Sequence, residues 1–181
     1  GDGYNENPGQ SLLDLLTIKE RKGSFEGLKV AIIGDLLHSR VAKSNIWGLT
    51  KLGAEVCVSG PPTFLLPGIE KFGVQVHYDV REAVNQADVI LTTRMRMEAQ
   101  DKTFLPSLDE YKRFFRIDHN LLRYAKEDAI VMHPGPIQRG IEISDGVIDS
   151  PQCIINDQIA NSVAVRMAMF YILSQMGGAL A

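Results

Sequence analysis

Four basic side chains follow short apolar runs in three separate segments of the sequence, and their chemistry is that of an anion site. Arg40 closes the first segment, Arg94 and Arg96 lie in the second, and His133 begins the third. A guanidinium can hold a carboxylate through two parallel hydrogen bonds, and clustered guanidiniums are costly unless an anion neutralises them. If the three segments meet, the sequence predicts a receptor for a small dianion such as a dicarboxylate.

The third segment continues as Pro134-Gly135-Pro136, a stiff turn with two fewer backbone donors that can present carbonyl groups to a ligand. Either X-Pro bond can be cis, which would turn such a carbonyl inward. Each feature alone also has an ordinary explanation. An arginine after a strand is commonly solvated or ion-paired, a histidine such as His38 or His133 commonly packs or hydrogen-bonds, and Pro-Gly-Pro is commonly a turn.

Five apolar runs, separated by segments with helical periodicity, must position these side chains. They predict an α/β fold: a three-layer, doubly wound parallel sheet of about five strands, Rossmann-like, in one domain. In the common strand order 3-2-1-4-5, ligands bind beyond the carboxyl ends of the strands at the switch point, so the loops after strands one, four and five should converge. The expected strands are Lys29–Ile33, Glu55–Ser59, Val74–Tyr78, Asp88–Thr92 and Ala129–Met132.

The expected helices lie between and outside these strands. The last is apolar around more than one face, which from the residues alone is typical of a helix wholly buried in its domain. The helical segments are a stretch that opens after Pro8-Gly9 and ends near Gly23, then Val41–Leu52, Ile69–Phe72, Val80–Gln86, Leu108–Phe115, Asp118–Lys126 and about Gln152–Gln175.

The composition of the 181 residues, 45% hydrophobic and 23% charged, excludes disorder and low-complexity filaments. Nineteen basic against 22 acidic residues leave a formal charge of −3, so nucleic acid is not an expected partner. Arg166 interrupts the longest apolar stretch near the C-terminus, and no membrane association is expected. Cys57 and Cys153 lie among apolar neighbours and suggest buried thiols; with no signal peptide at the first residues, we expect a cytoplasmic protein.

Nucleotide and metal sites are not indicated. The step Gly34-Asp35 after the first strand lacks G-x-G-x-x-G, and G-x-x-x-x-G-K-[ST] does not occur. Asp2, Asp35 and Glu98 do not form a metal-ligand pattern, and there is no Cys/His cluster. We therefore expect no metal and no nucleotide cofactor.

Taken together, the motifs resemble those of the aspartate carbamoyltransferases. The resemblance covers the aspartate-binding half of that family and the hinge leading into it, in the family's order along nearly the whole chain. The matching stretches are Gly1-Asp2-Gly3, Pro8-x-Gln10-x-Leu12-Leu13-Asp14-Leu15-x-Thr17-Ile18, Gly34-Asp35-Leu36-x-His38-Ser39-Arg40-Val41-Ala42-x-Ser44-Asn45, Arg94, and Met132-His133-Pro134-Gly135-Pro136-Ile137-x-Arg139-Gly140-x-Glu142-Ile143.

The resemblance implies transfer of a carbamoyl group from carbamoyl phosphate to the amine of L-aspartate, a step of pyrimidine biosynthesis that needs no cofactor. It implies that Arg40 and Arg94 hold the substrate's carboxylates. It also implies that Pro134 and Gly135 contact the carbamoyl group and the amine, with Pro136 following a cis bond.

Gln10 would lie beside the carbamoyl group. Two positions of the chain depart from the family. The family's His-Pro-Thr-Gln motif reads Asn7-Pro8-Gly9-Gln10 here, which replaces a histidine donor by a neutral amide, and Arg96 stands where the family has glutamine. A catalytically silent paralogue with a binding or regulatory role is therefore the alternative. The Ser-Met-Gly and His-Cys-Leu-Pro motifs of the ornithine enzymes are missing.

The resemblance also implies a division of the chain. Residues 1–24 would be a hinge helix from the carbamoyl-phosphate domain, 25–150 the aspartate-binding domain, and 151–181 a helix that returns to the first domain. That domain and its Ser-Thr-Arg-Thr-Arg phosphate loop are not in the sequence, so we expect a fragment that is inactive alone. A homotrimer is expected of the full enzyme, while a regulatory or dihydroorotase partner chain is left open.

Overall fold

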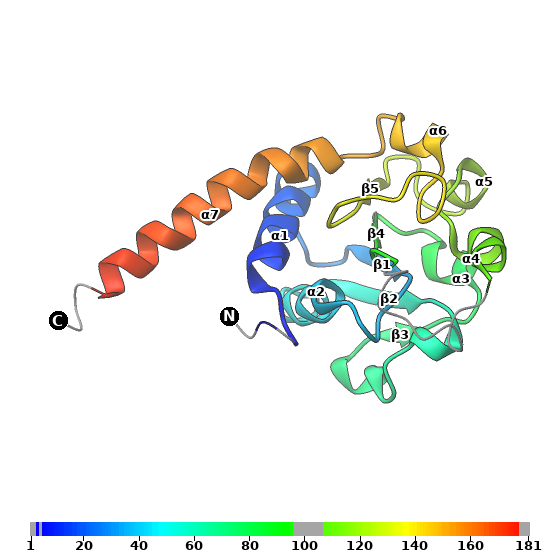
Figure 1. Ribbon diagram of the computed structural model, residues 1–181, viewed down its shortest axis with the longest axis horizontal. Helices are drawn as coiled ribbons and strands as arrows, with labels where there is room; N and C mark the ends of the chain where they lie inside the picture. The colour runs from blue at the N-terminus through cyan, green and yellow to red at the C-terminus, as the bar shows by residue number, and fades with distance from the viewer. Residues whose placement is uncertain (1–2, 4, 96–106, 178–181) are drawn as a thin grey trace.

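The computed structural model describes residues 3, 5–95 and 107–177; the predicted site residue Arg96 lies outside them. Strands and helices alternate along the chain, as the apolar runs predict (Figure 1). The elements are α1 (Pro8–Lys22), β1 (Lys29–Ile33), α2 (Arg40–Lys51), β2 (Glu55–Ser59), the 3₁₀ turns η1 (Pro62–Phe64) and η2 (Ile69–Phe72), β3 (Gln75–Val76), α3 (Val80–Val84), β4 (Val89–Thr92), α4 (Leu108–Phe115), α5 (His119–Leu122), β5 (Ile130–Met132), α6 (Asp145–Ile148) and α7 (Ile155–Gly177).

The five strands form one parallel sheet in the order β3-β2-β1-β4-β5, which confirms the predicted order. Ala31 in the central strand is in register with Cys57 of β2 and with Ile90 of β4, and Ile90 is in register with Val131 of β5. The carboxyl ends of β1, β4 and β5 therefore lie side by side at one edge of the sheet, as the prediction requires.

Helices cover both faces of the sheet, giving the three predicted layers. Figure 1 shows α1 and α2 on one side and α3, α4 and α5 on the other. Alternate strand residues divide between the two cores, because successive side chains of a strand point to opposite faces. Ile32 belongs to the core under α1 and α2, whereas Ala31 and Ile33 belong to the core under α3 to α6.

Some elements differ from the prediction in their bounds, and one was not expected. The edge strand β3 pairs only through Gln75 and Val76, because only β2 flanks it. Helix α5 ends at Leu122 rather than Lys126; beyond it the carbonyl of Tyr124 and the amide of Lys126 bond to the backbone around β4. The short helix α6 was not predicted, since four residues are too few to show helical periodicity.

The last helix begins at Ile155, not near Gln152, because the preceding residues extend along β5. The carbonyl of Gln152 accepts from Val131, and Ile154 donates to the carbonyl of Val131. Cys153 lies in this extended stretch and is only half-buried, so the expectation of two buried thiols holds for Cys57 alone.

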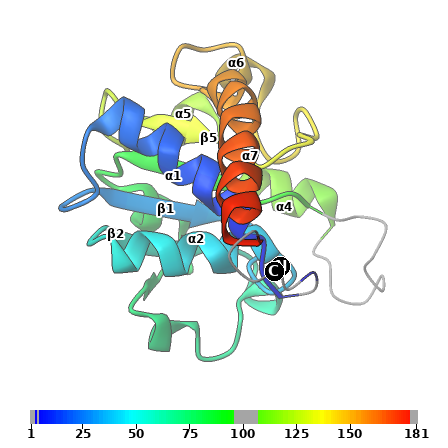
Figure 2. The same cartoon turned by 90° about the vertical axis from the view of Figure 1, so that its left-hand side faces the viewer.

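Helix α7 packs on α1 through its first turns and then projects beyond the sheet (Figures 1 and 2). Large apolar side chains along it are exposed, including Met167 at 66% and Phe170 at 73%. The alternative of a helix wholly buried in this domain is therefore wrong. No helix within the described residues combines the length and apolarity needed to cross a membrane.

Candidate functional site

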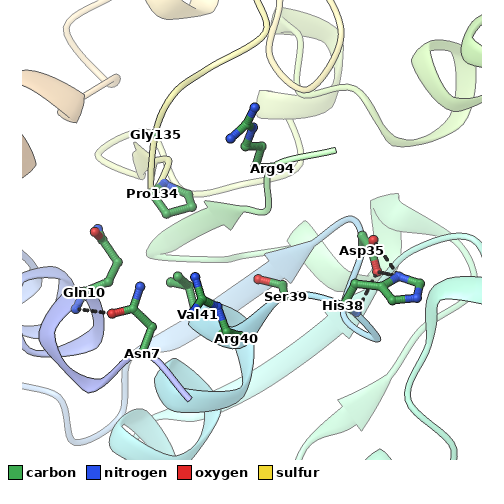
Figure 3. A pocket seen from close by; sticks show the side chains of 10 residues that line it. All are labelled: Asn7, Gln10, Asp35, His38, Ser39, Arg40, Val41, Arg94, Pro134 and Gly135. Atoms are coloured by element: carbon green, nitrogen blue, oxygen red, sulfur yellow. Dashed lines mark hydrogen bonds and ion pairs between the residues drawn. The ribbon is translucent and has the colours of Figure 1, made fainter. Parts of the chain in front are cut away.

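A cavity of about 180 Å³ lies where β1, β4 and β5 end. Figure 3 shows its lining: Asn7, Gln10 and Arg40 lie on one side, Pro134, Gly135 and Arg94 on another, and His38 lies beside Asp35 at the far end. Ser39 and Val41 complete the lining. The cavity thus draws on three loops beyond the sheet and on the start of α1.

The loop after β1 is tied to the end of β4 by a close backbone approach. Gly34 has φ of +123°, and a Cβ there would lie 2.4 Å from Thr93 Oγ1. Asp35 donates its backbone N–H to the same Thr93 oxygen at 2.7 Å. The buried Asp35 carboxylate in turn accepts from the backbone and from Nδ1 of His38. These bonds turn the chain so that α2 starts at the cavity.

Arg40 is the first residue of α2, which Ser39 caps by accepting from Ala42 N at 3.1 Å. The Arg40 guanidinium donates to the carbonyl of Gly3. The N-terminal end of a helix is electropositive, so the start of α2 and the Arg40 guanidinium both add to the positive potential of the cavity.

Arg94 follows β4 and is half-buried in the cavity wall. Its Nε is buried and has no hydrogen-bond partner among the described residues. The next residue anchors the loop: Met95 is buried and donates its N–H to Glu142 Oε1 at 2.9 Å. A guanidinium with unused donors, held by an anchored backbone, is suited to an anionic ligand.

Glu142 holds two loops of the site at once. Its other oxygen accepts from Gln138 N at 2.9 Å, in the segment after Pro-Gly-Pro. Burial raises the pKa of Glu142, while its hydrogen bonds with Met95 and Gln138 and the charge of Arg94 act against that rise. The carboxylate is therefore a fixed support behind the cavity.

The loop after β5 is organised by His133, which lies buried behind the lining rather than in it. His133 Nδ1 accepts from Gly135 N at 2.9 Å, which in the neutral ring leaves the proton on Nε2. Burial, together with the charge of Arg94, lowers the pKa of His133 to about 4. The bond between Gly135 and Pro136 is cis, as the resemblance implies, and Pro136 lies outside the lining.

Asn7 and Gln10 present two complementary amide atoms to the cavity. Asn7 caps α1: its Oδ1 accepts from Gln10 N at 3.2 Å, and among the described residues its Nδ2 donor is left for a ligand. Gln10 donates from Nε2 to Asp14 Oδ1 at 3.0 Å, so within the same ranges its Oε1 acceptor is left. A donor beside an acceptor matches the carbonyl oxygen and the NH₂ of a carbamoyl group.

The structure therefore brings most of the sequence-predicted residues into one cavity. Asp35, Ser39 and Val41 were not singled out as lining, although a serine directly before a periodic segment is a helix N-cap signal. No group of three His, Cys, Asp or Glu side chains within the described ranges could hold a metal ion. The predicted residues in the lining are Asn7, Gln10, His38, Arg40, Arg94, Pro134 and Gly135.

Comparisons with known proteins were consistent across sequence and structure. Residues 26–173 match the family model of the aspartate/ornithine carbamoyltransferase Asp/Orn binding domain. The aspartate carbamoyltransferase catalytic subunit of Ruminiclostridium cellulolyticum is 57% identical over 177 residues, 98% of this chain and 56% of the relative. That of Acetivibrio thermocellus is 56% identical over 175 residues, 97% of this chain and 56% of the relative.

Solved structures show the same architecture. The ornithine carbamoyltransferase of Pyrococcus furiosus superposes with a TM-score of 0.78 at 32% identity, over 91% of this chain and 55% of that one. The enzyme of Thermus thermophilus gives 0.79 at 26% identity, over 93% and 56%. The chain thus spans little more than half the length of the relatives it matches.

Proposed function

This chain belongs to the aspartate/ornithine carbamoyltransferase family, and from that premise we propose that it is the aspartate-binding half of an aspartate carbamoyltransferase. The whole enzyme would transfer the carbamoyl group of carbamoyl phosphate to the amine of L-aspartate, giving N-carbamoyl-L-aspartate and phosphate. The observation that carries the proposal is one cavity with guanidiniums from two loops and a donor–acceptor pair of amides.

Two arginines favour aspartate over ornithine as the acceptor. Arg40 and Arg94 would each take one carboxylate of a four-carbon dicarboxylate, whereas the cationic side chain of ornithine would meet like charge. The relatives at 56–57% identity are named aspartate carbamoyltransferases, in agreement with this preference.

The amides would place and polarise the second substrate. Asn7 Nδ2 would donate to the carbamoyl oxygen, where negative charge develops as the amine attacks, and Gln10 Oε1 would accept from the carbamoyl NH₂. Carbonyl groups of Pro134 and Gly135 would hold the amine close to the carbonyl carbon. The bond from nitrogen to carbon then forms and the bond from carbon to the phosphate oxygen breaks. The departing phosphate takes the bonding electron pair and the proton that the amine gives up, so positioning supplies much of the rate.

The remainder of the protein would complete the site. The exposed apolar side of α7, with Val163, Met167 and Phe170, would pack against the carbamoyl-phosphate domain, which would supply the phosphate contacts. We extend the proposal to the division at residues 24 and 150, to a homotrimer in the cytoplasm, and to roles for His38 and Arg96 in binding substrate. His133 and Pro136 lie outside the lining and would act by shaping the loop that contacts the substrate.

The test is an assay of carbamoylaspartate formation by the full-length protein, with L-ornithine as the competing acceptor. Aspartate-dependent product supports the proposal; carbamoylation of ornithine alone refutes it. An Asn7→His variant is assayed in parallel, because an asparagine is a weaker oxyanion donor than the histidine of the family motif. Activity in that variant only would identify a silent paralogue.

A further inference from the structure

A buried carboxylate is hydrogen-bonded to one of the two amide side chains that line the cavity. Asp14, on α1, is 1% exposed and accepts three hydrogen bonds from neutral amides on three helices. Gln10 Nε2 lies at 3.0 Å, Gln158 Nε2 of α7 at 2.8 Å and Asn45 Nδ2 of α2 at 2.8 Å. Burial raises the pKa of Asp14, and the three donors act in the opposite direction.

An ionised carboxylate only accepts hydrogen bonds, so it discriminates between the two ends of an amide. Gln10 must turn its NH₂ toward Asp14, and its oxygen is then the atom that faces the cavity. Without Asp14, no hydrogen bond would fix the amide of Gln10 in that orientation. In the reversed orientation the NH₂ of Gln10 would face the NH₂ of the carbamoyl group, and two donors cannot hydrogen-bond to each other.

The same carboxylate reaches the opposite wall through Gln158. Because Gln158 also turns its NH₂ to Asp14, its Oε1 is free to accept from His133 N, at 3.0 Å. His133 then accepts from Gly135 N through Nδ1. By accepting from both glutamines, Asp14 thus determines which end of each amide is left to accept a hydrogen bond, on both sides of the cavity.

We propose that Asp14 is a positioning residue for carbamoyl recognition: its carboxylate fixes the amide of Gln10 with the oxygen toward the carbamoyl NH₂, and through Gln158 it holds the loop that contains Gly135. The inference rests on the proposed function, because that function makes the carbamoyl NH₂ the group that hydrogen-bonds to the Gln10 oxygen.

The first experiment compares Asp14→Leu with Asn45→Leu in the full-length protein. Both remove a partner from the buried cluster and should lower the melting temperature, but only D14L frees Gln10. We expect kcat/KM for carbamoyl phosphate to fall about tenfold or more in D14L, the loss of roughly one hydrogen bond, and to stay within about threefold in N45L. Equal losses in the two variants would overturn the proposal.

A second experiment decides the question if D14L does not fold. In Gln10→Glu, two carboxyl groups would meet about 3 Å apart and share a proton, so kcat/KM for carbamoyl phosphate should fall more steeply with rising pH than in the wild type. Adding D14N removes one of the charges and should abolish the extra pH dependence. A Q10E profile that D14N leaves unchanged would overturn the proposal.

The positioning role of Asp14 can also be tested if the protein lacks the proposed activity. If the wild type forms no carbamoylaspartate, the orientation is read by NMR from hydrogen exchange of the Gln10 side-chain amide. D14L should accelerate that exchange at least about tenfold relative to N45L. Equal exchange in both variants would refute the positioning role without reference to activity.

Discussion

Replacing Arg94 by alanine should weaken the use of aspartate by about two orders of magnitude and leave carbamoyl phosphate almost unaffected. The guanidinium is half-buried, and its Nε has no partner within the described part of the chain. Truncation removes these donors from one carboxylate of the substrate. The loop itself should stay in place, because Met95 remains bonded to Glu142.

The magnitude follows from the bonds lost. A hydrogen bond to a charged group contributes roughly 1.5–3 kcal/mol, and two parallel bonds from one fork are less than additive, so about 3 kcal/mol is expected. That free energy corresponds to a rise of roughly 150-fold in KM for aspartate. Arg94→Lys keeps the charge and loses the fork, so it should cost about tenfold.

The assay is steady-state formation of carbamoylaspartate by the full-length protein, with each substrate varied at saturating levels of the other. Arg81→Ala is the matched control, since Arg81 is exposed, pairs with Asp79 and is not part of the cavity lining. Both KM values should stay within about twofold in that variant. An equal rise in both KM values for R94A would refute the assigned role, as would a fall in kcat with both KM values unchanged.

Three further predictions concern the supports of the site. The Glu142 carboxylate accepts from the backbone N–H groups of Met95 and Gln138. In Glu142→Gln the NH₂ would face one of these donors, and that bond would be lost. The substitution should lower the free energy of unfolding by about 1–3 kcal/mol in urea titrations. His133 has its pKa lowered to about 4 by burial and charge, so the unfolded chain takes up the proton first as pH falls. Stability is then intact above pH of about 6.5 and declines toward pH 4, and His133→Asn should flatten that slope in urea titrations across this range. Gly60→Ala places a Cβ 2.1 Å from the carbonyl oxygen of Gly34 and should cost at least about 2 kcal/mol by thermal unfolding.

Each of these has a contradicting outcome. An unchanged urea midpoint for E142Q would mean that the loops do not depend on its second acceptor. A slope for H133N that equals the wild type between pH 6.5 and 4 would mean that another group titrates. A G60A protein as stable as the wild type would mean that the two strand ends can move apart.

The architecture could be predicted from sequence because its signals are local. The runs that became β1, β2 and β4 are apolar and β-branched, and the order of a doubly wound sheet then brings their loops together. The meeting of Arg40 and Arg94 in one cavity follows from that order and from the position of each residue after its strand.

The polar supports could not be predicted because they depend on distant contacts. Asp14 and Gln158 are 144 residues apart, and nothing in either segment marks the other as its partner. The placement of His133 behind the lining depends on Gln158 in the same way. Which end of an amide faces a ligand is set by such tertiary hydrogen bonds and has no periodicity to read.

The contact between α1 and α7 joins segments from opposite ends of the described chain. The bonds from Gln158 to Asp14 and from Arg21 to Asp157 span 144 and 136 residues. Closing so long a loop is slow, because the entropy of bringing its ends together is lost before the contact forms. During synthesis, α7 leaves the ribosome after every strand of the sheet. A nascent chain can therefore complete its sheet well before Gln158 reaches Asp14 and the polar supports of the cavity are in place.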